Sequence, residues 1–389
     1  MKHELICEAE ALQPQLVQWR RDLHQIPELR LQLPQTVAYV RARLDEMGVN
    51  YRVYEDLSCI EALIGSGEPC YMLRSDMDGL PMAEETDLPY RSTNGCMHSC
   101  GHDLHTTILL GAAKLLKAHE SELKGTVKLF FQSGEEQVEG AKAAIEAGIL
   151  ENPKVDAVFA IHVIAMAPAG MLMTGKQPMS SVYNFRITLT GHGGHGSAPQ
   201  TCIDPINAGV QVYLALQSLL AREVASSDEA VLTIGKFTAG DISNVIPETC
   251  ELAGTLRTFD RKVRDHIVER FNEIVPAVAA AYRCKCQIDV LGDCPSVIND
   301  DEVTDSAERS IEALLPETKV IRGMRGTGSE DFAYLSERVP GSYYILGAGV
   351  EDKAQWLGQH NPKVLFNEDV LATGAAVYAK VAMDWLAEH

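Results

Sequence analysis

The segment Thr126-Val127-Lys128-Leu129-Phe130-Phe131-Gln132-Ser133-Gly134-Glu135-Glu136 joins a mostly apolar run to two adjacent carboxylates. The run is short and rich in aromatic and aliphatic side chains, which predicts a buried strand. Two carboxylates at the exit of a buried strand are costly unless a cation or hydrogen-bond donors stabilise them. An isolated Glu-Glu is more often a solvated pair at a helix N-terminus, where the helix dipole favours it. The residues elsewhere in the chain show which of these two interpretations is favoured.

A second group of reactive side chains lies upstream, in Met97-His98-Ser99-Cys100-Gly101-His102-Asp103. Cys100 and His102 are one residue apart, so in an extended segment both side chains face the same way. Thiolate and imidazole are preferred ligands of zinc. A small structural zinc site that also uses Cys96 and His98 is the alternative. Because structural zinc sites seldom recruit carboxylates, the downstream acid pair favours a catalytic metal.

Further candidate ligands stand at the ends of predicted strands. Asp76 and Asp78 follow one apolar run, and His162 ends another. Sites in open α/β sheets form outside the carboxyl ends of the strands, so these exits point to one shared site. Each residue also has a simpler interpretation. A lone histidine in an apolar strand is usually a core residue, and the two aspartates are either turn formers or carboxylates that orient a histidine ligand.

The first part of the chain alternates between helical and strand patterns. Strands are predicted at 51–54, 60–64, 71–74, 127–131 and 157–163, and helices at 8–25, from 34 to 47, at 104–119 and at 140–147. Such alternation is typical of a mainly parallel α/β sheet.

The pattern changes after Pro178. Strands are predicted at 181–190, 230–237, 249–258 and 285–291, with helices at 205–221 and 263–282. This β-α-β-β-α-β order is the ferredoxin-like signature. After Pro295 the α/β pattern resumes through 342–346 to a helix near 369–387. We therefore expect a discontinuous catalytic domain, 1–178 and 293–389, and an inserted domain, 179–292.

The inserted domain holds three features of interest. Gly191–Pro199 is rich in glycine, which allows a close backbone approach to a ligand, although it also suits a flexible hairpin tip. Asn244 and Arg257 are polar groups near predicted strands. Arg257 has the two-point geometry that grips a carboxylate, although a surface salt bridge is the simpler role.

The composition excludes several classes of protein. The chain has 389 residues, an apolar fraction of 46% and a formal charge of −20, which disfavours binding to nucleic acid. Its ten cysteines show no disulfide-framework spacing, and the charged start Met1–Leu5 has no apolar signal core, so we expect a cytoplasmic protein. The most apolar stretch, Ala157–Met173, is interrupted by His162 and Pro168 and is too short for a membrane span.

The chain as a whole resembles the zinc-dependent aminoacylase and carboxypeptidase superfamily. Within it, the resemblance is to the branch of hippurate hydrolases, N-acyl-amino-acid amidohydrolases and auxin-conjugate hydrolases. The motifs that carry the resemblance are Arg20–Leu29, Asp76–Asp78, Met97–His105, Phe131–Glu136, Ile161–Val163, Gly191–Pro199, Asn244–Pro247, Gly328–Phe332 and His360–Pro362. Two details differ from the common pattern: Gln132-Ser133-Gly134 replaces a segment with proline and alanine, and Ser99 stands where alanine is common. Neither touches an implied ligand.

The resemblance implies a catalytic α/β domain with two metal ions and a ferredoxin-like lid domain that forms a homodimer. The implied metal ligands are Cys100, His102, Glu136, His162 and His360.

The resemblance also implies roles for four other residues. Glu135 would be the general base. His195 would reach from the lid of the partner subunit to stabilise the oxyanion. Asn244 and Arg257 would hold the carboxylate of the substrate or help to close the lid.

The predicted function is metal-dependent cleavage of the amide bond of N-acyl amino acids, with acetyl, benzoyl or similar acyl groups. Zinc is the first candidate metal, with manganese, cobalt or nickel as alternatives. A dipeptidase or carboxypeptidase on the same scaffold is the alternative enzyme. A non-catalytic metal-binding or interaction protein would need a broken ligand set, whereas all five implied ligands and the base are present.

Overall fold

The computed structural model describes residues 3–389. The predicted catalytic domain and the charged start Met1–Leu5 both begin at Met1, outside the described residues. The chain forms two compact units. The first comprises Met1–Pro178, Val297–Arg325 and Asp331–His389, and the second comprises Met179–Ser296 and Gly326–Glu330. The short segment 326–330 packs with the second unit, where Ser180 N–H donates to Gly328 O at 2.9 Å. The boundary after Ser296 lies four residues beyond the predicted end at 292.

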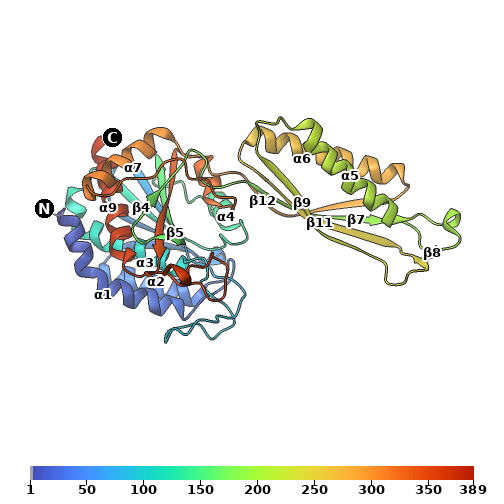
Figure 1. Ribbon diagram of the computed structural model, residues 1–389. Coiled ribbons are helices and arrows are strands. Elements are labelled where there is room, and N and C mark those ends of the chain that lie inside the picture. Colours follow the sequence, from blue (N-terminus) through green and yellow to red (C-terminus); the bar gives the residue numbers. More distant parts are fainter. Residues whose placement is uncertain (1–2) are drawn as a thin grey trace. The chain divides into compact units, whose positions relative to one another are not determined.

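A seven-stranded sheet forms the centre of the first unit (Figure 1). Its strands, in the order β1-β2-β4-β3-β5-β13-β6, are Asn50–Tyr54, Cys59–Gly65, Thr126–Gln132, Cys70–Asp76, Ala157–Pro168, Gly341–Gly349 and Leu172–Met173. The central neighbours β4, β3, β5 and β13 run parallel, whereas β1, β2 and β6 pair antiparallel. The expected mainly parallel sheet is therefore wrong in detail, and the sheet is mixed. The reason is local: only the short turn at Glu55–Leu57 separates β1 from β2, too few residues for a parallel crossover.

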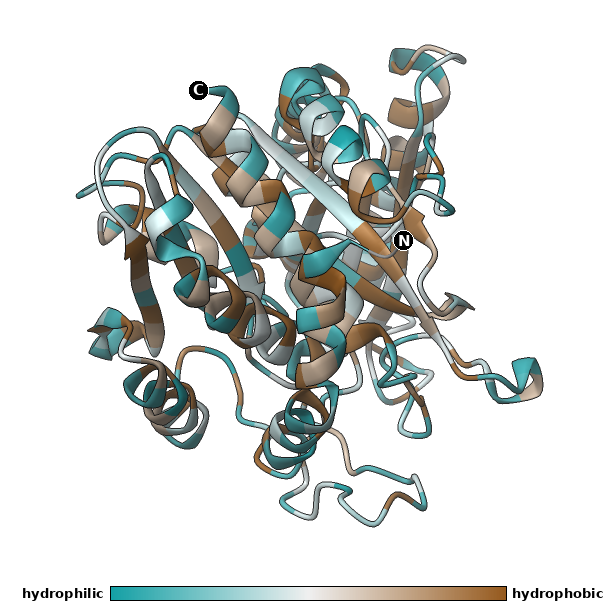
Figure 2. Ribbon diagram, turned by 90° about the vertical axis from the view of Figure 1, so that its left-hand side faces the viewer, coloured by the Kyte–Doolittle hydropathy of each residue, from teal (hydrophilic) through white to brown (hydrophobic). Residues whose placement is uncertain are grey.

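Two groups of helices pack against this sheet. The larger group is α1 (Glu4–His24), α2 (Pro34–Met47), α3 (His102–Ala118), α7 (Asp301–Leu314) and α9 (Val370–Glu388). The smaller group is α4 (Gly140–Glu146) and α8 (Phe332–Ser336), which contact each other and strands β4, β5 and β13. Helix α7 was not predicted, although its apolar side chains recur at helical spacing. Figure 2 shows teal and brown residues on different faces of these helices, as expected for elements that bury one side.

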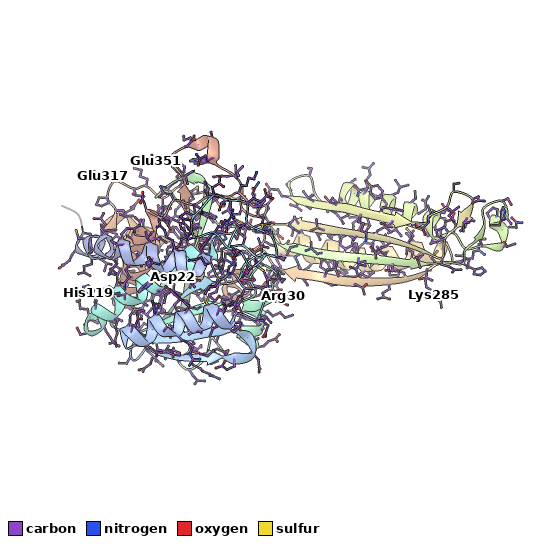
Figure 3. The ribbon with its side chains drawn as sticks, turned by 90° about the horizontal axis from the view of Figure 1, so that it is seen from below. Asp22, Arg30, His119, Lys285, Glu317 and Glu351 are labelled. Carbon is purple, nitrogen blue, oxygen red and sulfur yellow. The ribbon has the colours of Figure 1, made fainter. Side chains whose placement is uncertain are left out.

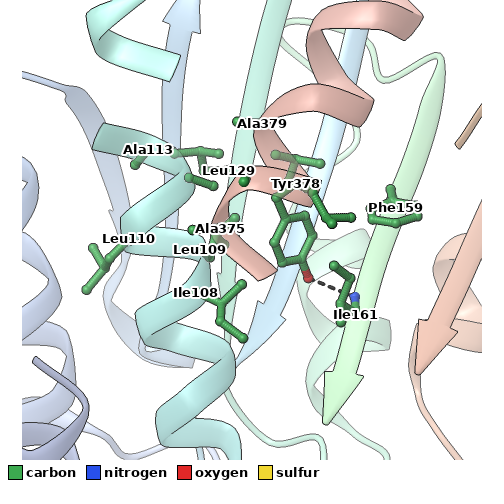
Figure 4. Close-up of a cluster of buried hydrophobic side chains, with 14 of the residues drawn as sticks. Ile108, Leu109, Leu110, Ala113, Leu129, Phe159, Ile161, Ala375, Tyr378 and Ala379 are labelled. Atoms are coloured by element: carbon green, nitrogen blue, oxygen red, sulfur yellow. Dashed lines mark hydrogen bonds between the residues drawn. The ribbon is translucent and has the colours of Figure 1, made fainter. Parts of the chain in front are cut away.

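Helix α9 is long and apolar enough to cross a membrane by length and composition alone. However, 72% of its apolar window is buried inside the structure, so it packs as a core helix. Figure 4 shows Ala375, Tyr378 and Ala379 of α9 among Ile108, Leu109 and other core side chains.

Tyr378 separates two strands at the point where the site begins. The register of β3 and β5 ends at Arg74 opposite Ala160. Beyond it, the Tyr378 hydroxyl donates to Arg74 O at 2.6 Å and accepts from Ile161 N at 2.8 Å (Figure 4). The hydroxyl thus replaces ladder hydrogen bonds, and the carboxyl ends of the two strands are free to diverge.

The second unit is a four-stranded antiparallel sheet with two helices packed against it (Figure 1). Its elements are β7 (Val182–Thr190), α5 (Pro205–Glu223), β9 (Ala230–Ala239), β11 (Thr249–Thr258), α6 (Arg261–Ala281) and β12 (Lys285–Cys294). The sheet order is β12-β7-β11-β9, and β8 (Gly194–His195) pairs separately with β10 (Val245–Ile246). Buried and half-buried residues alternate along β7, as the period-two pattern predicts. Polar side chains such as Lys285 project from this unit in Figure 3.

Candidate metal centre

The carboxyl ends of β3 and β4, the middle of β5 and the start of α3 bring together a cluster of ligand-type side chains in the first unit. The prediction that His162 ends its strand is wrong, because β5 continues to Pro168. Cys100, His102 and His162 present one ligand atom each within 4.8 Å of one another. Cys100, Glu136 and His360 form a second group by the same measure. Cys100 belongs to both groups, which is the arrangement expected where one thiolate lies between two cations. All five predicted ligands therefore lie in one place.

His102 occupies the first position of α3, and the chain geometry before it fixes that place. Gly101 has φ 93°, and a Cβ there would lie 2.5 Å from Cγ2 of Val163 on β5, so only glycine fits. His102 Nδ1 donates to Asp78 O at 2.9 Å. The neutral ring therefore keeps its lone pair on Nε2, the nitrogen that faces the carboxylates of the cluster.

The acid pair is fixed through its backbone by one carboxylate. Asp78 accepts from the N–H of Glu135 at 3.0 Å and from the N–H of Glu136 at 3.2 Å. Both glutamates turn toward the cluster: Glu135 Oε2 lies 3.9 Å and Glu136 Oε1 4.0 Å from His102 Nε2. Asp78 thus orients the acid pair, a role that the sequence alone did not assign to it.

His162 and His105 are held as a linked pair. His162 Nδ1 donates to Val163 O at 2.6 Å, which leaves Nε2 beside Cys100 Sγ at 3.4 Å. His105 Nδ1 donates to Asp76 Oδ1 at 2.5 Å, and its Nε2 accepts from Val163 N at 2.8 Å. Because both nitrogens of His105 are used, it is not a free ligand even though it lies near His102 and Asp76.

His360 completes the cluster from a loop. Its Nε2 lies 3.4 Å from Glu136 Oε2, and its side chain is 54% exposed, whereas the Glu136 side chain is 4% exposed. The entrance to the cluster is therefore on the His360 side.

The electrostatics of the cluster call for a cation. Burial and the Glu136 carboxylate raise the pKa of the Cys100 thiol well above its usual value. Burial opposes the charged form of His102, but Asp76 and Cys100 raise the pKa of this histidine well above its usual value. Burial and His105 hold the pKa of His162 well below its usual value, so its ring is neutral. A divalent cation would offset the excess of acidic groups and displace the proton of His102.

The residues fit such a cation. Among residues 3–389, His102 Nε2 finds no hydrogen-bond partner although it is fully buried, and a carboxylate oxygen of Asp76 lies 3.8 Å away. A buried nitrogen without a partner costs about 1–3 kcal/mol, which ligation would recover.

The alternative of a structural zinc site is not supported. Within the described residues, none of the ligand groups includes Cys96 or His98. Instead, the buried side chains of Arg20 and His24 contact Asp103 in the first turn of α3: Arg20 Nε is 2.7 Å and His24 Nδ1 2.8 Å from Asp103 Oδ2. This buried network holds the first turn of α3 and gives a role to Arg20 and His24 of the Arg20–Leu29 motif.

His195, Asn244 and Arg257, the predicted site residues of the second unit, lie on or next to its strands. His195 lies on β8 opposite Val245 of β10, next to Asn244, and it is exposed. Arg257 lies on β11, half-buried, and donates to Thr255 Oγ1 and to Leu256 O. Within the described part of the chain Arg257 forms no salt bridge.

Sequence reasoning named Asp76 and Asp78 as residues that could orient a histidine ligand, but it gave His105 and Gln359 no defined role. His105 stands three residues after His102 on α3, a spacing that places both rings on one face of the helix and could have linked them. Gln359, which donates to Val163 O at 2.8 Å, had no sequence signal beyond its place beside His360.

An acid beside a cluster of thiolate, imidazole and carboxylate groups defines a class, the metal-dependent hydrolases. The chain belongs to the peptidase family M20/M25/M40, whose model matches residues 72–384. The predicted family and the predicted class of enzyme, a metal-dependent hydrolase of amide bonds, are both confirmed.

Three relatives show the range of the family. The chain is 36% identical to the IAA-amino acid hydrolase ILR1-like 2 of Arabidopsis thaliana, over 97% of this chain and 88% of the relative. It is 37% identical to the N-acetyl-L-cysteine deacetylase of Bacillus subtilis (92% and 85%). It is 35% identical to the thermostable carboxypeptidase 1 of Saccharolobus solfataricus (95% and 94%).

A solved structure extends the likeness to the fold. The YXEP protein of Bacillus subtilis, described as a dinuclear metal binding peptidase from the M20 family, matches with a TM-score of 0.81 at 32% identity. The match covers 97% of this chain and 99% of that protein. The mixed α/β fold with a central sheet is thus a fold of this family.

Proposed function

We propose that this protein hydrolyses the amide bond of N-acyl amino acids and releases a carboxylic acid and a free amino acid. The observation that carries the proposal is the position of Glu135, whose carboxylate lies 3.9 Å from His102 Nε2 at the edge of the ligand cluster. Two of the named relatives support the substrate class, since one is called an IAA-amino acid hydrolase and the other an N-acetyl-L-cysteine deacetylase.

The proposed cofactor is a pair of divalent metal ions. The proposed ligands are Cys100, His102, Glu136, His162 and His360. Thiolate and imidazole favour zinc, with manganese, cobalt or nickel as alternatives. When bound, such ions lower the pKa of water and polarise the carbonyl of the substrate.

Glu135 is the proposed general base and acid. Its carboxylate takes the proton from the attacking water and then delivers it to the nitrogen of the departing amine. The hydrogen bond from its backbone N–H to Asp78 keeps the carboxylate directed at the cluster. Glu136, fixed by the same aspartate, stays a ligand, so the two adjacent carboxylates divide the roles.

His195 is the proposed donor to the oxyanion, acting from the second unit and, in a dimer, across to the partner. Its Nδ1 accepts from Ser197 N–H at 3.1 Å, so the neutral ring carries its proton on Nε2, where it can donate. Arg257 and Asn244 are proposed to hold the carboxylate of the substrate. The half-buried guanidinium of Arg257 supports this role, since among residues 3–389 no carboxylate pairs with it.

The second unit is proposed to be a ferredoxin-like lid and the place where two copies meet. Its element order, β7-α5-β9-β11-α6-β12, agrees with a ferredoxin-like unit. β9 is an edge strand, which exposes unpaired backbone groups to another chain. Exposed apolar side chains gather on β9 and on α5, which packs against it: Val210, Tyr213, Leu214, Val231 and Phe237. A homodimer would cover them.

A dipeptidase or carboxypeptidase activity is the second candidate, because one named relative is a thermostable carboxypeptidase. The test is a panel of substrates on the metal-loaded protein: N-acetyl, N-benzoyl and long-chain acyl amino acids against free dipeptides. The proposal expects the highest kcat/KM for an N-acyl amino acid. Faster cleavage of dipeptides with free amino groups would favour the peptidase instead. A cytoplasmic location and the absence of nucleic-acid and membrane partners stay predictions.

A further inference from the structure

The backbone of Val163 is a shared anchor inside the candidate metal centre. Its carbonyl accepts two hydrogen bonds, from His162 Nδ1 at 2.6 Å and from Gln359 Nε2 at 2.8 Å. Its N–H donates to His105 Nε2 at 2.8 Å. The backbone N–H and C=O of this one residue therefore contact side chains from β5, α3 and the loop before His360.

The anchor is itself held in place. His105 is fixed on its other nitrogen by Asp76, whose second oxygen accepts from Arg74 at 2.9 Å. Arg74, Asp76 and His105 are each 2% exposed or less, so water does not compete for these bonds. The Val163 backbone is thus a rigid point from which other groups can be positioned.

The backbone of the loop that carries His360 has to be held in place by contacts with its surroundings. His360 has φ 63°, the left-handed region that a non-glycine residue occupies only when the surrounding structure holds it there. Two hydrogen bonds hold this loop beside the other ligands. His360 N–H donates to Ser99 O at 3.2 Å, next to Cys100, and Gln359 donates to Val163 O, next to His162.

We propose that Gln359 is a positioning residue for His360, and that it sets the affinity of the metal ion that His360 and Glu136 would bind. The inference rests on the proposed function in that it requires a two-metal centre. It adds a residue that reaches neither metal nor substrate and acts through the Val163 carbonyl. The metal ion that His102 and His162 would bind does not depend on Gln359, because Asp78 O and Val163 O fix those rings directly.

The test is metal binding by Gln359→Met, which keeps the length of the side chain and removes the donor. Equilibrium dialysis against buffered Zn²⁺, followed by elemental analysis, gives the affinity of each ion. Gln355→Met is the matched control, since Gln355 is exposed in the same segment and its side-chain amide donates to Asp352 at 3.3 Å. Thermal unfolding of the metal-free proteins shows whether each variant folds as the wild type does.

We expect the wild type and Gln355→Met to bind two ions alike. Gln359→Met should bind the first ion normally and the second about 10–100-fold more weakly, with kcat recovering at high metal concentration. Wild-type affinity for both ions in Gln359→Met would overturn the inference, and so would equal weakening of both. If Gln359→Met fails to fold, Gln359→Asn, whose amide is one methylene too short, should show the same split. If the wild type does not bind two ions per chain, the proposed function itself is contradicted.

Discussion

The two units hold their candidate functional side chains in different ways. In the first unit, His102 and His162 each donate one nitrogen to a backbone carbonyl, and Asp78 fixes the backbone of both glutamates. In the second unit, His195 is exposed, and Arg257 has no carboxylate partner within the described residues. The ligand side chains of the first unit are held in place by other residues of that unit before any substrate binds. His195 and Arg257 of the second unit are left available for a substrate. Metal binding should therefore depend on the first unit alone, and turnover on both.

The largest effect is expected from Glu135→Gln. The amide cannot accept a proton from water, so kcat should fall by at least about 10²–10⁴-fold, while the metal content stays near that of the wild type. Turnover of an N-acyl amino acid and elemental analysis on the same sample measure both quantities. Glu146→Gln, an exposed change on α4, is the control. Normal turnover in Glu135→Gln would remove this residue from the role of base.

His195→Ala should lower kcat by about 10²–10³-fold, the cost of one oxyanion donor, and leave the metal content unchanged. His192→Ala, in the same glycine-rich segment and 67% exposed at its side chain, should behave as the wild type. Loss of metal from His195→Ala would contradict the statement that metal binding depends on the first unit alone.

Action across a dimer can be tested with the same variants. When Glu135→Gln and His195→Ala subunits are mixed, a dimer can combine an intact base with an intact histidine from the partner, so part of the activity should return. The absence of recovery after subunit exchange has been demonstrated would argue that His195 acts within its own chain or not at all.

Asp78→Asn should weaken metal binding by about 10–100-fold, because the amide cannot accept from both glutamate N–H groups at once and Glu136 loses its orientation. Asp87→Asn, an exposed change in the following loop, is the control. Titration with Zn²⁺ measures the affinity. Unchanged affinity in Asp78→Asn would show that the acid pair is held by other means.

The smallest effect is expected from Arg257→Met, which should raise KM by about tenfold, the value of one hydrogen bond to a charged group, with little change in kcat or metal content. Arg186→Met, on the neighbouring strand β7, is the control. A large fall in kcat with constant KM would mean that Arg257 acts on the reacting atoms rather than on the carboxylate of the substrate.

The sequence predicted the ligands better than their supports, and the reason is physical. Each of these residue types has a simpler role when it stands alone, but Cys100, His102 and Glu136 were conspicuous because ligand-type side chains recur near several strand exits. Their supports are ordinary groups: the Val163 and Asp78 carbonyls, and the Gln359 amide, carry no signal until the backbone is known. His360 was found only through the family resemblance, because its loop has no periodic pattern.

The fold shows the same division. The period-two and helical patterns predicted most elements, including β7 and α5, but they missed α7 at Asp301–Leu314. They also overstated the parallel character of the sheet, since the direction of β1 and β2 depends on the length of their connection rather than on side chains. The role of Tyr378 in parting β3 from β5 depends on a contact between residues more than 200 positions apart, which no local pattern reveals.

The most direct test of the account is metal content and hydrolysis measured together on the purified protein. Elemental analysis gives metal per chain, and N-acetyl and N-benzoyl amino acids are assayed before and after chelation and after metal is returned. The account predicts close to two ions per chain and cleavage that is lost with the metal and regained with it. One tightly held ion with no cleavage of any amide would contradict it.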